Sequence, residues 1–164
     1  MTTVHEEVTF EAPYFQAAEA LEQRLGLERG RPEGRSVLTL IAPLAEGRDL
    51  VRDVTATTKM LGGANFASRY ELSWPAGTTR RGIPTPGFDG ILTLRAGEDF
   101  DESQLVLDGG YTAPGGVVGR IFDDVVGRRV AHATLGALLD GVRRALRAEH
   151  ERIEAQKHPA EVAG

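Results

Sequence analysis

The chain has 164 residues, 41% hydrophobic and 26% charged, which is enough for one domain with a sizeable core. Its net charge of -5 at pH 7 excludes a general attraction to nucleic-acid backbones or anionic lipid. It has no cysteine, so disulfides and thiolate chemistry are excluded.

The first part of the chain predicts a strand followed by a helix. Residues 4–10 have strand-forming side chains at both ends. Pro13 suits the first turn of a helix, and apolar residues then recur at helical spacing from Tyr14 to Leu25. The segment 26–34 is rich in glycine, proline and charge, so we expect a loop there.

Residues 36–112 change to a period near two, which is typical of strands. The third candidate strand alternates best, because Phe66, Tyr70, Leu72 and Trp74 share one face. Short connectors with turn-forming residues favour antiparallel pairing. The longer connector 75–87, with three prolines and three glycines, predicts a mobile flap. Five strands are therefore expected, at 36–42, 50–59, 65–74, 88–95 and 104–112.

The end of the chain predicts a long amphipathic helix. On a helical wheel one apolar stripe spans roughly 60°, and it consists of Ala131, Leu135, Leu138, Val142, Leu146 and Ile153. Apolar residues between 118 and 125 fall about 140° out of phase with that stripe, so we expect a break near Gly127 between a short and a long helix. We expect one domain over residues 1–154 and a frayed tail over 155–164, which contains Pro159.

Several of these residues match a known pattern. They are the run GYTAPGGVVG at 110–119, Asp123, the run GRRVA at 127–131, Trp74-Pro75 at a strand end, and Gly-x-Leu-x-Leu at 90–94. Together they resemble a bacterial branch of the START/polyketide cyclase/Bet v 1-like (SRPBCC) superfamily. The resemblance implies an α+β helix-grip fold, in which a curved antiparallel sheet wraps around a long C-terminal helix above a cavity. Its members bind lipids, sterols, polyketides, plant hormones or quinones, and a minority catalyse cyclisation or hydrolysis. Members commonly place two short helices after the first strand, whereas only one is predicted here.

The candidate ligand site follows from the strand that alternates best. If its apolar face turns inward, it lines a cavity together with residues of the last strand and of the long helix. Such a lining favours an apolar ligand with one hydrogen-bonding end. The expected lining is Phe66, Tyr70, Trp74, Tyr111, Leu135, Leu138 and Val142, and the expected polar rim is Arg69, Arg128 and His132.

Three hypotheses about function stay open. The favoured one is a binding protein, for transport or sequestration, that holds a hydrophobic small molecule such as a lipid, polyketide or quinone. The second is a cyclase- or hydrolase-type enzyme that uses His132 with a buried carboxylate such as Glu71. The third is an interaction module with a filled core, which would form a homodimer through its sheet edge or terminal helix. The common hydrolase, metalloprotease and nucleotide-binding motifs do not occur, which favours binding over catalysis.

We expect neither cofactor nor metal, and neither nucleic acid nor stable membrane insertion. The histidines are too scattered for a metal site, and the acidic cluster 98–102 lacks the spacing of a calcium loop. No segment approaches the roughly 20 apolar residues that cross a bilayer. The first ten residues lack the basic and apolar regions of a signal peptide, so a cytoplasmic protein is expected.

Overall fold

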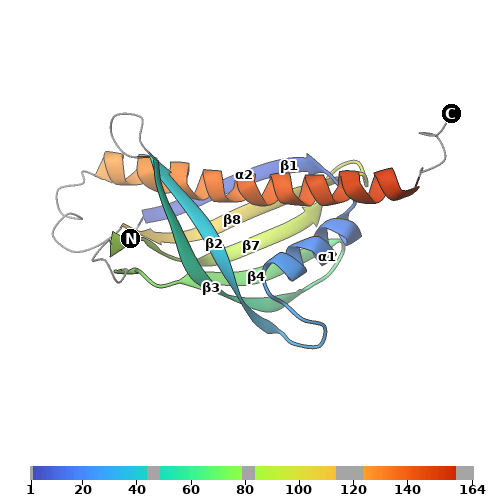
Figure 1. The fold of residues 1–164 in the computed structure, drawn as a ribbon, viewed down its shortest axis with the longest axis horizontal. Coiled ribbons are helices and arrows are strands. Elements are labelled where there is room, and N and C mark those ends of the chain that lie inside the picture. Colours follow the sequence, from blue (N-terminus) through green and yellow to red (C-terminus); the bar gives the residue numbers. More distant parts are fainter. Residues whose placement is uncertain (1, 44–48, 79–83, 114–123, 158–164) are drawn as a thin grey trace.

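A six-stranded antiparallel sheet curls around one long helix in the computed structural model (Figure 1), which describes residues 2–43, 49–78, 84–113 and 124–157. The strand order is β1-β8-β7-β4-β3-β2, so β1 and β2 form the two edges. The predicted helix-grip fold is confirmed. Its elements are β1 (Thr2–Glu11), α1 (Tyr14–Arg24), β2 (Glu33–Pro43), β3 (Asp49–Gly63), β4 (Ala67–Trp74), β7 (Gly87–Ala96), β8 (Glu102–Thr112) and α2 (Asp124–Lys157).

Helix α2 lies along both edges of the sheet, because it packs on β1 and on β2 (Figure 1). Its apolar stripe faces the concave side of the sheet, and five of the six predicted stripe residues are buried. Burying each leucine of the stripe stabilises the fold by about 1.5–3 kcal/mol. The opposite face carries ion pairs one turn apart, such as Asp140 with Arg143 and Arg147 with Glu151. The buried stripe residues are Ala131, Leu135, Leu138, Val142 and Leu146.

Helix α1 is the single described helix between β1 and β2, which matches the one helix expected from the sequence. It ends at Arg24, and Gly26 then adopts a left-handed φ of 74°. A Cβ at Gly26 would lie 2.1 Å from the carbonyl oxygen of Arg35, so only glycine allows the chain to pass β2 this closely. The loop that follows leads away from α1 and into β2.

The structure differs from the sequence-based expectations at the start of β4 and in the long helix. Strand β4 begins at Ala67, because Asn65 and Phe66 form a turn with φ values of 56° and 60°. Helix α2 continues through Gly127, so the predicted break there is wrong. Of the three out-of-phase residues that suggested the break, 118 and 122 lie outside the described residues, and only Val125 belongs to this helix. The part of the predicted short helix before Asp124 lies outside the described residues, as do residues 158–164 of the predicted tail.

The predicted flap at 75–87 contains a short two-stranded ladder. Strand β5 (Gly77–Thr78) pairs with β6 (Pro84–Thr85), and residues 79–83 between them lie outside the described part. Among the described helices, α1 and α2 both fall short of the apolar length that would span a membrane.

Candidate functional site

The sequence-predicted lining is mostly gathered in the core between the sheet and α2. Six of its members belong to one cluster of buried residues: Tyr70, Trp74, Tyr111, Leu135, Leu138 and Val142. Tyr70 and Leu135 are 0% exposed, so no water-sized space adjoins them. The interior around these two residues is filled, and a ligand held there requires side chains or α1 to move.

Four other predicted residues lie outside this cluster. Arg69 faces away from the core on β4, and Arg128 is exposed on α2. The side chain of His132 is 48% exposed. The expectation that Phe66 faces inward is wrong: it is 47% exposed, since it precedes β4 in the turn and does not follow the alternation of the strand.

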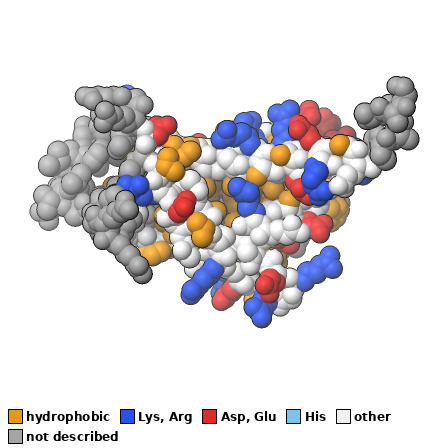
Figure 2. Space-filling model, viewed as in Figure 1, with side chains coloured by type: hydrophobic (Ala, Val, Ile, Leu, Met, Phe, Trp, Pro, Cys, Tyr) orange, Lys and Arg blue, Asp and Glu red, His pale blue; other side chains and the backbone are white. Residues whose placement is uncertain are grey.

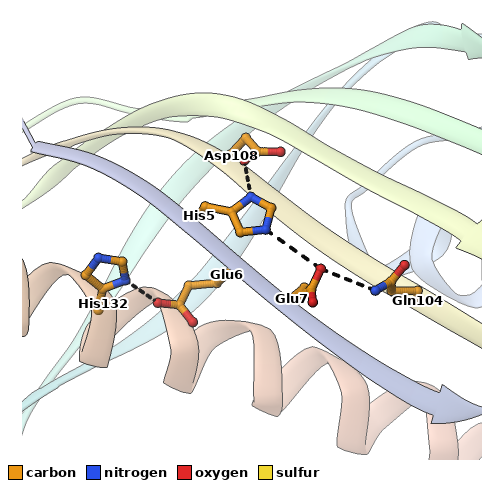
Figure 3. A network of polar contacts seen from close by, with 6 residues as sticks. All are labelled: His5, Glu6, Glu7, Gln104, Asp108 and His132. Atoms are coloured by element: carbon orange, nitrogen blue, oxygen red, sulfur yellow. Dashed lines mark hydrogen bonds and ion pairs between the residues drawn. The ribbon is translucent and has the colours of Figure 1, made fainter.

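The structure also separates the two candidate catalytic residues. On β4, Glu71 alternates with the buried Tyr70 and Leu72, so it lies on the convex face and is exposed. The buried carboxylate required by the enzyme hypothesis is therefore not Glu71. His132 instead meets Glu6 of β1, with 2.5 Å between Nδ1 and Oε1 (Figure 3). The sequence missed this partner because β1 and α2 are far apart in the chain.

A second polar network lies on the convex face of β1 and β8 (Figure 3). The imidazole of His5 hydrogen-bonds the carboxylate of Asp108, and its Nε2 lies 3.7 Å from Glu7 Oε2. Gln104 donates to the same Glu7 oxygen at 3.3 Å. The hydrogen bond and the charge of Asp108 raise the pKa of His5 above its ordinary value. Successive residues of a strand face opposite sides, so His5 and Glu6 belong to separate networks.

These networks do not form a metal centre. Across the described ranges, His, Asp and Glu side chains nowhere gather in threes in a way that suits a metal ion.

A groove of about 830 Å³ lies beside α1. One wall is the outer side of α1, and the other is formed by the loop 27–32 and the ends of β3 and β4. Charged groups of Glu19, Glu22 and the loop 28–31 edge the groove. Its apolar lining is Tyr14, Phe15, Ala18, Leu27 and Met60. The sequence did not indicate this groove, because its residues come from four separate segments.

Two polar contacts join α1 to β4 between the groove and the core. The hydroxyl of Tyr70 donates to Glu22 Oε1 at 3.0 Å, and the hydroxyl of Tyr14 contacts the hydroxyl of Ser68. Burial raises the pKa of Tyr70, which keeps this phenol protonated as a donor. Tyr70 thus connects the packed core to the wall of the groove, since its ring is buried and its partner Glu22 lines the groove.

An aromatic cluster (Tyr14, Phe15, Phe66 and Phe100) lies at one end of the groove. Phe15 and Phe66 contact edge to face at 5.7 Å, and Phe66 contacts Phe100 at 5.9 Å. Phe15 is 70% exposed and Phe100 is 74% exposed. The mouth of the groove is therefore flanked by apolar rings that face solvent.

The view in Figure 2 also shows hydrophobic side chains in the middle of one face, beneath α2, between positive and negative side chains.

The fold resembles that of several solved structures, although no family model and no curated protein matches the chain. A STAR-related lipid transfer protein from Xanthomonas axonopodis superposes with a TM-score of 0.59 at 14% identity, covering 88% of this chain and 85% of that one. The Zhui aromatase/cyclase from a Streptomyces species gives 0.56 at 21% identity, covering 92% and 94%. A protein from Thermus thermophilus gives 0.54 at 17% identity, covering 90% and 98%. At these identities the likeness shows a shared helix-grip fold.

Proposed function

We propose that this protein binds a hydrophobic small molecule, which enters through the groove beside α1 and is held between the sheet and α2. The fold supports this function, because similar architectures occur in a lipid transfer protein and in an aromatase/cyclase. The observation that carries the proposal is the groove itself. Its volume of about 830 Å³ falls within the range typical of ligand sites, and apolar side chains line it.

Helix α1 is the element that moves in this proposal. It packs mainly through Ala17 and Leu21, a far smaller apolar surface than that of α2. The Tyr70–Glu22 and Tyr14–Ser68 contacts then hold α1 against β4. Releasing these two contacts would open a path from the groove to the apolar core, in which Tyr70, Trp74, Tyr111, Leu135, Leu138 and Val142 are the proposed ligand contacts.

A charge placed in the groove tests the proposal. Met60 lines the groove on β3, and Met60→Glu would put a carboxylate where the ligand must pass. Val51→Glu is the matched control, since Val51 lies on the same strand, is 52% exposed and is absent from the groove lining. With lauric acid as the probe, we expect Met60→Glu to raise the dissociation constant about tenfold or more, a loss of about 1.4 kcal/mol. Val51→Glu should bind as the wild type does.

Two outcomes of this experiment would count against the proposal. If Met60→Glu and Val51→Glu weaken lauric acid binding equally, the added charge acts at long range and not in the groove. If the wild type binds neither lauric acid nor any hydrophobic molecule retained from cells, as judged by native mass spectrometry, ligand binding is refuted. The interaction-module hypothesis would then be favoured, with light scattering as its first test.

A further inference from the structure

We propose that the ring of Phe88 occupies a subsite for a planar aromatic ligand that carries a carbonyl or hydroxyl oxygen. The subsite has Gly90 and Gly109 as its floor and the hydroxyl of Tyr111 as its hydrogen-bonding group. This inference rests on the proposed function and adds the position and the chemistry of the ligand.

The floor of the subsite lacks side chains because two glycines are paired. Gly90 of β7 lies directly opposite Gly109 of β8. Both face the concave side, since they are two residues from the buried Phe88 and Tyr111 respectively. A Cβ at Gly90 would lie 2.2 Å from the carbonyl oxygen of Asp108 and 2.6 Å from Phe88 Cζ. A Cβ at Gly109 would lie 2.5 Å from the carbonyl oxygen of Asp89 and 2.7 Å from the same ring atom. The two glycines therefore allow the backbones of β7 and β8 to approach closely, and the Phe88 ring covers the depression that they leave on the sheet.

Apolar groups surround this depression on the sheet. Val4 is the neighbour of Gly109 on β1, and Leu72 is the neighbour of Gly90 on β4. The ring of Trp74 stacks on Phe88 with a centroid distance of 5.0 Å and an interplanar angle of 29°. A flat aromatic ring that replaced Phe88 would keep the stacking on Trp74 and the contact with the glycine floor.

The residue paired with Phe88 carries a buried hydroxyl that lacks a hydrogen-bond partner of good geometry among the described residues. Tyr111 pairs directly with Phe88 across the strands, and among the described residues its hydroxyl has no hydrogen bond of good geometry. The neighbouring Thr134 hydroxyl donates to the carbonyl oxygen of Val130 at 2.7 Å, and its oxygen offers Tyr111 an acceptor that does not reach good hydrogen-bond geometry. Burial raises the pKa of Tyr111, so the phenol stays protonated and able to donate. A ligand oxygen would accept this hydrogen bond.

A second unpaired hydroxyl lies in the same row as the glycines. Thr58 on β3 is the neighbour of Leu72, is 0% exposed, and has no hydrogen-bond partner among the described residues. An aromatic ring over paired glycines also stabilises a sheet in proteins that bind nothing. That role explains the position of Phe88, but it does not explain why two hydroxyls in the neighbouring positions are buried without partners.

The test compares two probes of nearly equal shape, 2-naphthol and 2-methylnaphthalene, by equilibrium dialysis. We expect the wild type to bind 2-naphthol about tenfold more tightly, which corresponds to one hydrogen bond. Tyr111→Phe keeps the ring and removes only the hydroxyl, so the preference should disappear. Without ligand, the free energy of unfolding of Tyr111→Phe should equal or exceed that of the wild type, because the substitution removes an unpaired hydroxyl.

Phe88→Leu is the second variant, in case Tyr111→Phe fails to fold. A leucine leaves the glycine floor less covered, so both probes should bind more tightly than to the wild type while the preference for 2-naphthol remains. Because Trp74 is the only tryptophan of the chain, a change in its near-ultraviolet circular dichroism reports displacement of the stacked Phe88 ring.

Lauric acid binding, measured in parallel, separates failure of the subsite from failure of the proposed function. If lauric acid binds but the wild type shows no preference for 2-naphthol, the subsite is refuted and the proposed function stands. A preference that persists in Tyr111→Phe also refutes it. If neither lauric acid nor the naphthalenes bind, both proposals fall.

Discussion

The hydrogen bond between Tyr70 and Glu22 should contribute measurably to the stability of the fold, because it joins α1 to the sheet. The substitution Tyr70→Phe keeps the buried ring and removes a hydroxyl that donates to Glu22 Oε1 at 3.0 Å. Hydrogen bonds to a charged group contribute about 1.5–3 kcal/mol. Glu22 is half-buried at the wall of the groove, so water can replace the lost donor, and the lower end of that range applies.

We therefore expect Tyr70→Phe to lower the free energy of unfolding by about 1.5 kcal/mol. For a chain of this length each kcal/mol changes the melting temperature by about 2–4 °C, so a decrease of about 3–6 °C should accompany it. Urea unfolding followed by circular dichroism measures the first quantity, and calorimetry measures the second. The same substitution should speed the association of lauric acid, because α1 loses one of its two polar contacts with β4.

A charge-matched pair on α1 controls this experiment. Glu22→Gln keeps a carbonyl acceptor for Tyr70 and should cost about 0.5–1 kcal/mol. Glu19→Gln removes the same charge from the same side of the helix and should stay within about 0.5 kcal/mol of the wild type. If Tyr70→Phe unfolds at the same urea concentration as the wild type, Tyr70 does not hold α1 in place, and its proposed role in ligand entry is refuted.

Three further predictions concern pH and packing. The pKa values of Tyr70 and Tyr111 are raised above the usual value of 10.0, so the stability that the protonated phenols contribute is complete below pH 10 and is lost as the pH rises further. Urea unfolding above pH 10 should therefore show a steeper loss of unfolding free energy in the wild type than in Tyr111→Phe. Parallel curves for the two proteins would contradict this. Asp108→Asn should lower the pKa of His5 toward 6.5 in an NMR titration of its ring protons; an unchanged titration would show that Asp108 is not the cause. Leu135→Ala should cost about 3 kcal/mol, because Leu135 is fully buried in the apolar stripe of α2; a cost below about 1 kcal/mol would mean that the stripe is loosely packed.

The elements that were predicted well carry their signal in local periodicity. The stripe of α2 follows the helical period over several turns, and Tyr70, Leu72 and Trp74 follow the strand period, so their burial could be foreseen. In the sequence Phe66 falls on the same face of the alternating pattern as Tyr70. It nevertheless precedes β4 in a turn with a positive φ, which the alternation cannot reveal. Glu71 follows Tyr70 in the same strand and therefore faces the other side of the sheet, so the same alternation already indicated an exposed position for Glu71.

The features that were missed depend on how distant segments align. The groove combines α1, the loop 27–32, Met60 and Ser68, which no local pattern connects. The pairing of Gly90 with Gly109 depends on the register between β7 and β8, and one residue of slip would remove it. The Glu6–His132 contact likewise requires α2 to lie along β1.

Methyl NMR during a titration with lauric acid would locate the ligand most directly. We expect shifts in the methyl signals of Leu135, Leu138 and Val142, which lie on the buried face of α2, and in that of Met60 at the groove. The methyl signals of the exposed Val37 on β2 and Val51 on β3 should keep their positions. Saturating shifts confined to Val37 and Val51, or no shifts at any of these methyls, would contradict ligand binding between the sheet and the helix.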